Sequence, residues 1–330
     1  MNGITSQGNT ARFRKCFANK SVTLRFLGVI FLALFLFLAL GNEGKLLAAA
    51  GKQRSFASPE AAVDALAKAI KASKMKELML ILGPDSGTLV ASGDAVQDRR
   101  RREQFSRAYG EKKRLERGPD GLARLFIGKD DWPFPFPLVK VKTNWLFDTQ
   151  AGKQEIFSRR IGANELNAIQ VCLAILDAQN EYADLMRVAN GQPEYAQKFE
   201  GTPGKRDGLY WETPPGSIAS PLGPLLARAR AEGYHEAVGK SIPFHGYLFR
   251  ILKAQGDKAN GGAFDYLIGG KLIGGFAVVA FPALYGSSGI QTFMVNHEGV
   301  VYRKDLGRET AEIVLAMTTF NPDATWKKVE

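Results

Sequence analysis

The chain has 330 residues, of which 45% are hydrophobic and 23% charged, and its formal net charge is +11. This composition is ordinary for a globular protein with apolar cores, and the length favours two domains. Residues 1–50 hold six Lys and Arg against one Glu, so nearly half of the excess charge lies there. The rest is spread thinly, whereas nucleic-acid binding requires a concentrated basic patch, so we expect no nucleic-acid partner.

The N-terminus has the pattern of an export signal. Basic residues precede an apolar run at 26–40, and three alanines follow at 48–50. Residues 1–50 are therefore predicted to be a signal peptide or a membrane anchor. The run is short for a membrane span, which favours cleavage near Ala50. The remainder is expected to be exported, periplasmic or extracellular; the alternative is an inner-membrane protein whose membrane contact is limited to residues 24–40.

Three helices are predicted to open the exported part. Ser58 suits the N-cap and Pro59 the first helical position of a helix that runs to residue 70. Further helices are predicted at 75–82 and 94–109. The last contains Arg99 to Arg102, which a helix spreads around its surface. A solvated face is one interpretation of this run, and contact with anionic lipid or cell wall is the other.

Short strands then predict a curved antiparallel sheet. Residues 118–121 read Gly-Pro-Asp-Gly, a hairpin turn, and alternate prolines at 132–138 favour an extended edge segment. Strands are expected within 139–147, before a turn at 148–152. Helices followed by a sheet give an α+β domain, residues 51–157. This order resembles the cystatin-like and nuclear-transport-factor-like folds, a likeness of fold that implies no function.

A long helix is predicted to open a second domain, residues 158–330. Asn164 is its expected side-chain cap, and Cys172 is expected to be a small buried hydrophobe. The apolar residues at helical spacing, expected to face the core, are Leu166, Ile169, Cys172 or Leu173, Leu176 and Ala183.

Strands and turns follow this helix. Strands are predicted at 247–252, 276–282, 291–296 and 300–303, and short helices at 221–231 and 309–318. The second domain is therefore predicted to be α+β, with the long helix packed on an antiparallel sheet of about four strands.

The second half also resembles the globular domain of type IV pilin-like and pseudopilin proteins. The residues that carry this resemblance are Asn164-Glu165, Ala178-Gln179, Tyr182-Ala183, Gly246-Tyr247, Ala280 with Pro282, and Gly289. It implies a pilin-like fold. About a hundred residues precede the helix here, whereas a pilin's helix continues directly from its membrane segment, so assembly into a filament is not expected.

Short aromatic and glycine motifs run along the whole exported region. They include Trp132-Pro133-Phe134-Pro135, Arg159-Arg160-Ile161-Gly162, Asp207-Gly208-Leu209-Tyr210-Trp211, His245-Gly246-Tyr247 and Gly274-Gly275-Phe276-Ala277. In these motifs the region resembles a bacterial family known as domain of unknown function 2950. The resemblance implies an exported α+β protein, and it supplies no catalytic residues because the family has no established activity.

The sequence contains no pattern that predicts a metal or a cofactor. His235, His245 and His297 are far apart and none is paired at metal-ligand spacing, and the glycine pairs match no phosphate-binding loop. We therefore expect no metal ligands, no cofactor and no assigned catalytic residue.

The junction of the two predicted domains is the candidate site. The polar residues at this junction have two interpretations. One is an ion pair of an arginine with Glu165 or Asp148 that joins the domains, and the other is a polar groove for an anionic or glycan ligand. The candidate groove residues are Arg159, Arg160, Glu165, Gln179, Tyr182, Tyr210, Trp211 and His245. A non-enzymatic module that binds an envelope partner or cell-wall component is the expected function. The alternative is an envelope hydrolase or transferase with its site at the junction.

Overall fold

The structure, a computed structural model, describes residues 53–234 and 242–329. Contacts divide the chain after Gln53, and residues 54–330 form one compact unit. Within the described residues, none of the helices combines the length and hydropathy that a membrane span needs. The apolar run and the alanines of the predicted export signal lie outside the described residues.

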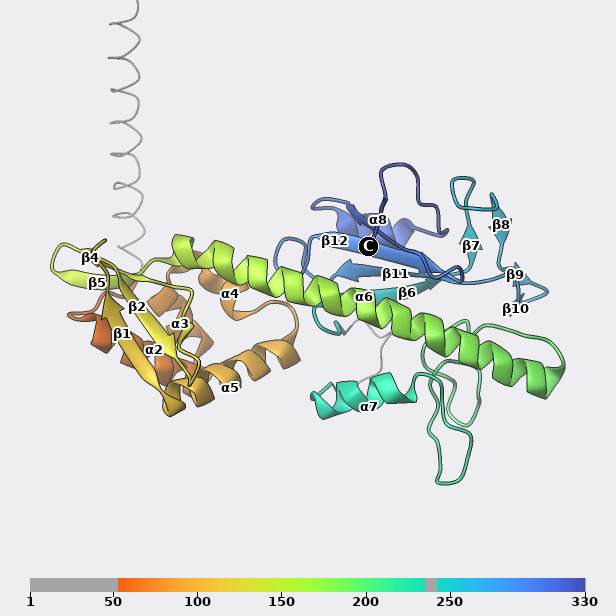
Figure 1. Cartoon of the computed structure of the whole chain (residues 1–330), viewed down its shortest axis with the longest axis horizontal. Coiled ribbons are helices and arrows are strands. Elements are labelled where there is room, and N and C mark those ends of the chain that lie inside the picture. The colour runs from red at the N-terminus through yellow and green to blue at the C-terminus, as the bar shows by residue number, and fades with distance from the viewer. Residues whose placement is uncertain (1–52, 235–241, 330) are drawn as a thin grey trace, which may run out of the picture. The chain divides into compact units, whose positions relative to one another are not determined.

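The predicted N-terminal helices are confirmed (Figure 1). They are α2 (Pro59–Lys71), α3 (Met75–Leu82) and α5 (Ala95–Glu111), with the short helices η1 (Pro84–Ser86) and α4 (Gly87–Val90) between the last two. Ser58 Oγ accepts a hydrogen bond from the Ala61 N–H at 3.1 Å and caps α2. Asp94 caps α5 by accepting from the Gln97 N–H at 2.9 Å.

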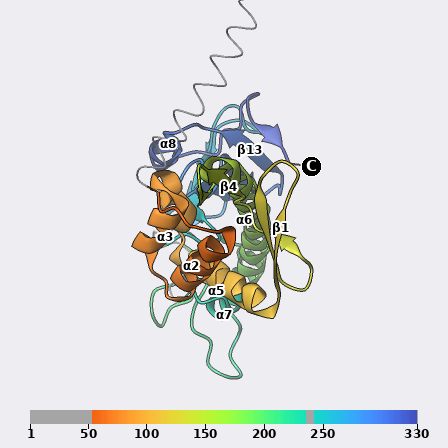
Figure 2. The same cartoon turned by 90° about the vertical axis from the view of Figure 1, so that its left-hand side faces the viewer.

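These helices pack on an antiparallel sheet. Its strands are β1 (Lys113–Arg117), β2 (Ala123–Ile127), β3 (Trp132–Pro133), β4 (Leu138–Val141) and β5 (Asn144–Phe147). The strand order is β1-β2-β4-β5, and β3 pairs with the C-terminal end of β2, at Phe126 and Ile127. Figure 2 shows α2, α3 and α5 beside this sheet at the near end of α6. Their buried side chains form one apolar cluster, the N-terminal core.

The long helix α6 spans Thr149–Asn190 and is longer than predicted. The turn expected at 148–152 is wrong, because Asp148 accepts from the Ala151 N–H at 3.0 Å and thereby caps the helix. Asn164 is therefore not a cap: it lies in mid-helix and is only 1% exposed. The predicted boundary between residues 157 and 158 falls inside this continuous helix and stays a prediction.

The buried face of α6 differs in part from the predicted one. Its buried apolar residues are Ala168, Val171, Cys172, Ile175, Ala178, Tyr182 and Ala183. Leu166, expected to be buried, is 68% exposed because it lies about 200° around the helix from Ala168. Cys172 is a buried hydrophobe as expected, and burial raises the pKa of its thiol to about 12.

The C-terminal sheet follows the predicted strands. It contains β6 (Tyr247–Leu252), β11 (Ala277–Pro282), β12 (Gln291–Asn296), β13 (Val301–Asp305) and the short β14 (Lys327–Lys328). The order is β14-β13-β12-β11-β6, all antiparallel, and α6 contacts β11 and β12. Helices α7 (Gly223–Ala231) and α8 (Thr310–Ala316) match the two short helices predicted. The ribbons β7 (Ala254–Gln255) with β8 (Phe264–Asp265), and β9 (Leu267–Ile268) with β10 (Lys271–Leu272), complete the fold.

Candidate functional site

The structure distributes the eight predicted groove residues over three places. Arg159, Arg160 and Glu165 lie on the first half of α6, Gln179 and Tyr182 lie on its second half beside Tyr210 and Trp211, and His245 precedes β6. Glu165 and Gln179 are 14 positions apart, which is about 21 Å along a helix. The eight residues therefore do not line a single groove.

The expected ion pair of an arginine with Glu165 or Asp148 is wrong. Arg160 is 4% exposed and donates to the carbonyl oxygens of Thr88 and Leu89 at 2.8 and 2.7 Å, and to Ser287 Oγ at 3.3 Å. Glu165 accepts from the Ile290 and Gln291 N–H groups instead, both at 3.0 Å.

The neighbouring Arg159 is half-exposed. It pairs with Glu155 at 2.6 Å and its guanidinium lies 5.1 Å from the ring centroid of Trp132. Two adjacent arginines thus have different roles: Arg160 joins α4 to α6 through backbone oxygens, and Arg159 lies at the surface.

The residues on the second half of α6 contact the long connection between α6 and α7 and hold it in place. The Gln179 amide exchanges two hydrogen bonds with the Ala196 backbone, at 2.9 and 2.8 Å. The Tyr182 hydroxyl donates to the Arg206 carbonyl at 2.9 Å, and burial raises the pKa of Tyr182 to about 12. The Trp211 ring packs edge-on against Tyr182. All these polar atoms are occupied by the chain itself, which indicates a structural role.

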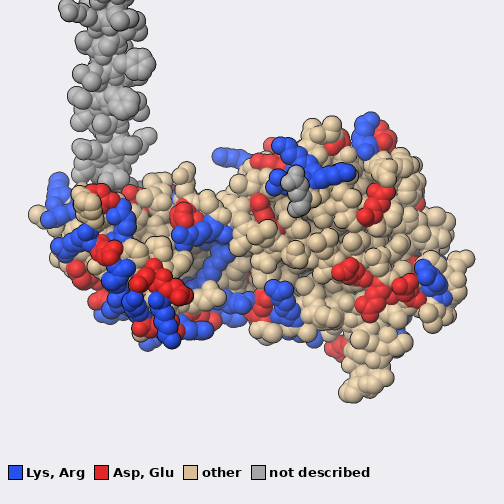
Figure 3. Space-filling view, viewed as in Figure 1, with Lys and Arg blue, Asp and Glu red and all other residues tan. Residues whose placement is uncertain are grey.

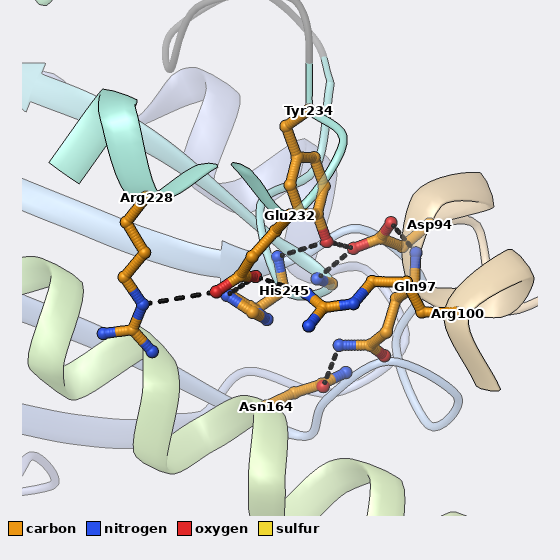
Figure 4. A network of polar contacts seen from close by, with 9 residues as sticks. Asp94, Gln97, Arg100, Asn164, Arg228, Glu232, Tyr234 and His245 are labelled. Atoms are coloured by element: carbon orange, nitrogen blue, oxygen red, sulfur yellow. Dashed lines mark hydrogen bonds and ion pairs between the residues drawn. The ribbon is translucent and has the colours of Figure 1, made fainter. Parts of the chain in front are cut away.

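His245 belongs to a buried polar network between α5, α7 and the start of β6 (Figure 4). Asp94 Oδ2 accepts from the Tyr234 hydroxyl at 2.7 Å and from the Gly246 N–H at 3.0 Å. Glu232 forms ion pairs with Arg100 at 2.8 Å and Arg228 at 3.2 Å. His245 Nε2 lies 3.0 Å from Glu232 Oε2 but without hydrogen-bond geometry.

A second polar contact joins α5 to α6. The Gln97 side-chain amide donates to Asn164 Oδ1 at 3.1 Å, and the Asn164 amide donates to the Ser288 carbonyl at 2.8 Å. One buried residue of α6 therefore links the N-terminal helices to the loop before β12.

The network makes stability depend on pH through His245. Burial lowers the pKa of His245, and repulsion by Arg228 and Arg100 adds to this effect against the opposing attraction of Glu232 and Asp94. The folded pKa is then below the unfolded value of about 6.5, so the unfolded chain binds the proton more strongly. This contribution to stability is complete above about pH 6.5 and is lost as the pH falls below it.

We therefore expect the free energy of unfolding, measured by urea denaturation, to be lower at pH 5.5 than at pH 7.5. This one proton gives a slope of at most about 1.4 kcal/mol per pH unit. His245→Asn is expected to flatten the profile, and asparagine suits the positive φ of 49° at this position. An unchanged slope in the variant would assign the pH dependence to another group.

A cavity of about 500 Å³ lies within the N-terminal core. Its inner wall is formed by buried apolar side chains of α2, α3, α4, β2 and the segment after β3, among them Leu66, Leu78, Leu82, Leu89, Ile127 and Phe136. Its outer wall is formed by α5, α6 and Trp132, which is 43% exposed. Arg101, Arg102, Arg159 and Arg160 lie on this outer wall, with Asp98.

Two of the eight predicted residues, Arg159 and Arg160, thus line a cavity that the sequence did not predict. The polar network contains further residues that were missed: Asp94, Glu232 and Tyr234. Asp94 carries a signal in hindsight, because an Asp before a helical pattern is a preferred N-cap. Arg101 and Arg102 belong to the run noted in the sequence, but their burial depends on the fold.

On the face shown in Figure 3, Lys and Arg alternate with Asp and Glu over the N-terminal part of the unit, at the left. In the part of the chain that the structure describes, no group of three or more His, Cys, Asp or Glu is placed to hold a metal ion. His235 lies outside that part.

Comparisons with known proteins give a family. Neither the curated proteins nor the solved structures include a match to the chain, and nothing found supports the resemblance to pilin-like domains. A family model described as "Protein of unknown function (DUF2950)" matches residues 53–329, which is most of the chain. The chain therefore belongs to the DUF2950 family.

Proposed function

We infer that the protein is a binding module that takes an apolar ligand into the cavity of the N-terminal core. The cavity itself carries this inference. Its volume of about 500 Å³ lies within the usual range of small-molecule sites, and its inner wall is apolar with a few polar groups at one side.

The shape of the space also favours a ligand. Protein cores are close-packed and contain few voids larger than a water molecule. A space of about 500 Å³ that opens at one side, beside the exposed Trp132, is therefore a pocket that a ligand can enter and not a gap left by packing.

The carboxylates at the cavity and at the predicted junction favour binding over acid–base catalysis. Asp98 accepts from the Ser92 N–H at 2.7 Å and from Ser92 Oγ at 2.8 Å. Glu165, at the predicted junction, accepts two backbone hydrogen bonds. Both groups are engaged within the chain, whereas a general base must be within reach of a substrate proton.

Displacement of the neutral fluorescent probe N-phenylnaphthylamine from the full chain tests this function. Octanol, decanol and dodecanol are expected to displace the probe, with affinity rising about fourfold per added methylene, because each buried methylene contributes about 0.8 kcal/mol. Ala108→Trp, which places an indole in the cavity, is expected to abolish this binding. Ala95→Trp, the same change at an exposed position of the same helix, is the matched control.

If the alcohols displace no probe from the wild-type protein, or displace it equally from the Ala108→Trp and Ala95→Trp variants, the cavity is not a binding site. Thermal melts of both variants show whether each is folded before binding is compared.

The basic residues and apolar run at the N-terminus support a location across the membrane, in the cell envelope, where the ligand or partner would be an envelope or cell-wall component. A cleaved signal peptide and an inner-membrane anchor differ in the N-terminus of the mature protein. Mass spectrometry of the mature N-terminus is expected to find a start near Gly51, whereas a start at Met1 would favour the anchor.

A further inference from the structure

The charged residues that line the cavity of the N-terminal core all belong to α5 and α6. Its inner wall, from α2, α3, α4 and β2, is aliphatic and aromatic, while four arginines stand on the outer wall from α5 and α6. Among the described residues that line the cavity, Asp98 supplies the one carboxylate, and both its oxygens accept hydrogen bonds from Ser92. The outer wall therefore has an excess of positive charge beside an apolar interior.

Two of these arginines lack the partners that their neighbours have. On α5, Arg99 lies 3.9 Å from Glu103 and Arg100 lies 2.8 Å from Glu232. In the described part of the chain, the side chains of Arg101 and Arg102 form no ion pair and no hydrogen bond with a protein group, although both are partly buried. The Nε atoms of Arg102 and Arg160 are buried without a hydrogen-bond partner.

An unpaired guanidinium in such a place is costly, because burial removes water without supplying an acceptor. Burial lowers the pKa of Arg101, and it lowers the pKa of Arg160 to about 10, with repulsion by Arg101 adding to the effect on Arg160. The attraction of Asp98 for both offsets only part of this. An anion between the arginines would accept their hydrogen bonds and reverse the repulsion.

We propose that the cavity binds a single-chain anionic amphiphile, with its alkyl chain among the apolar side chains and its carboxylate or phosphate head on Arg101, Arg102 and Arg159. This inference rests on the proposed function, because it names the ligand class of the same cavity. The alkyl chain accounts for the apolar lining, and the head accounts for Arg101 and Arg102, which have no acceptor among the described residues. Arg159 would contact the head from beside its pair with Glu155. Trp132, beside Arg159, lies at the mouth where chain and head would meet.

A neutral apolar ligand fits the inner wall equally well but leaves the arginines unpaired. A hydrophilic anion without a chain pairs the arginines but leaves the apolar volume unfilled. Only a ligand with both parts satisfies both walls.

The test compares four ligands that share one chain and differ in the head: dodecyl phosphate, dodecanoate, dodecanol and dodecyltrimethylammonium. Affinities for the full chain are measured by displacement of N-phenylnaphthylamine at low and high salt. The two anions are expected to bind about 10- to 100-fold more tightly than the alcohol, as one charge-assisted hydrogen-bond site allows. The cation is expected to bind most weakly, and added salt to reduce the advantage of the anions. A comparison of the phosphate with the carboxylate identifies the preferred head.

The double variant Arg101→Gln/Arg102→Gln is expected to bring the ratio of anion to alcohol affinity close to one. Arg99→Gln/Arg107→Gln removes the same charge from exposed positions of the same helix and is expected to retain the ratio. Since Arg101 and Arg102 bond to no group in the described part of the chain, and Arg101 repels Arg160, their replacement is expected to retain or raise the melting temperature.

The outcomes separate the two proposals. Equal affinities of the anions and the alcohol for the wild-type chain would overturn the amphiphile while leaving an apolar site. An anion advantage that survives in Arg101→Gln/Arg102→Gln, or disappears equally in the control, would overturn the assigned head position. If none of the four ligands displaces the probe, the binding function itself fails.

Discussion

Replacing Asp94 with alanine is expected to lower the free energy of unfolding by about 3–7 kcal/mol, because three donors lose their acceptor at once. Asp94 is 2% exposed, caps α5 through the Gln97 N–H, and accepts from the Tyr234 hydroxyl and the Gly246 N–H. The cap accounts for about 1 kcal/mol, and each buried unsatisfied donor adds about 1–3 kcal/mol. Urea denaturation followed by circular dichroism measures the change.

Asp148→Ala is the matched control. Asp148 caps α6 through the Ala151 N–H at 3.0 Å, and among the described residues its side chain makes no long-range hydrogen bond of the kind Asp94 makes. Its loss is expected to cost about 1 kcal/mol. Equal effects of the two substitutions would show that the links from Asp94 to Tyr234 and Gly246 contribute nothing to stability.

Arg160→Ala is expected to lower the free energy of unfolding by about 3 kcal/mol, whereas Arg159→Ala is expected to change it by less than about 0.5 kcal/mol. Arg160 is buried and donates to the Thr88 and Leu89 carbonyls, so its loss removes a donor from each and leaves the Thr88 carbonyl only the longer bond from Ser287 Oγ at 3.4 Å. Relief of the repulsion from Arg101 offsets only part of this cost. Arg159 loses a surface pair with Glu155, and such pairs contribute little.

The same urea measurement on both variants tests this contrast between neighbouring arginines. If Arg160→Ala is no more destabilising than Arg159→Ala, the bonds from α6 to α4 do not stabilise the fold, and the destabilising effect of Arg101 on Arg160 outweighs them.

Most of the fold was predictable because local patterns agree with the tertiary structure. Ser58 with Pro59 and the Gly118 to Gly121 turn are signals that hold in any context, and they mark the observed start of α2 and the β1–β2 hairpin. The start of α6 was missed because Gly152 and the turn-forming residues around it read as a chain reversal. Gly152 is required there for packing: a Cβ atom would lie 2.1 Å from the Phe136 ring.

The candidate site was predictable only in part. The burial of Leu166 was wrongly expected because helical spacing alone does not fix which side of a helix meets the core. The sequence pointed to Arg159 and Arg160 as adjacent charged residues, but the partners of Arg160 are the backbone carbonyls of Thr88 and Leu89, which no sequence pattern marks. The cavity depends on the space left between side chains of five helices, two strands and the segment after β3, and that space is a property of packing.

The most direct measurement of the central claim is a crystal structure of the full chain grown with bromododecane, in which the bromine gives an anomalous signal. We expect a bromine peak within the cavity, among side chains such as Leu66, Leu89, Ile127 and Phe136. A cavity closed by these side chains, with no bromine peak inside it, would contradict the assignment of the N-terminal core as a ligand-binding site.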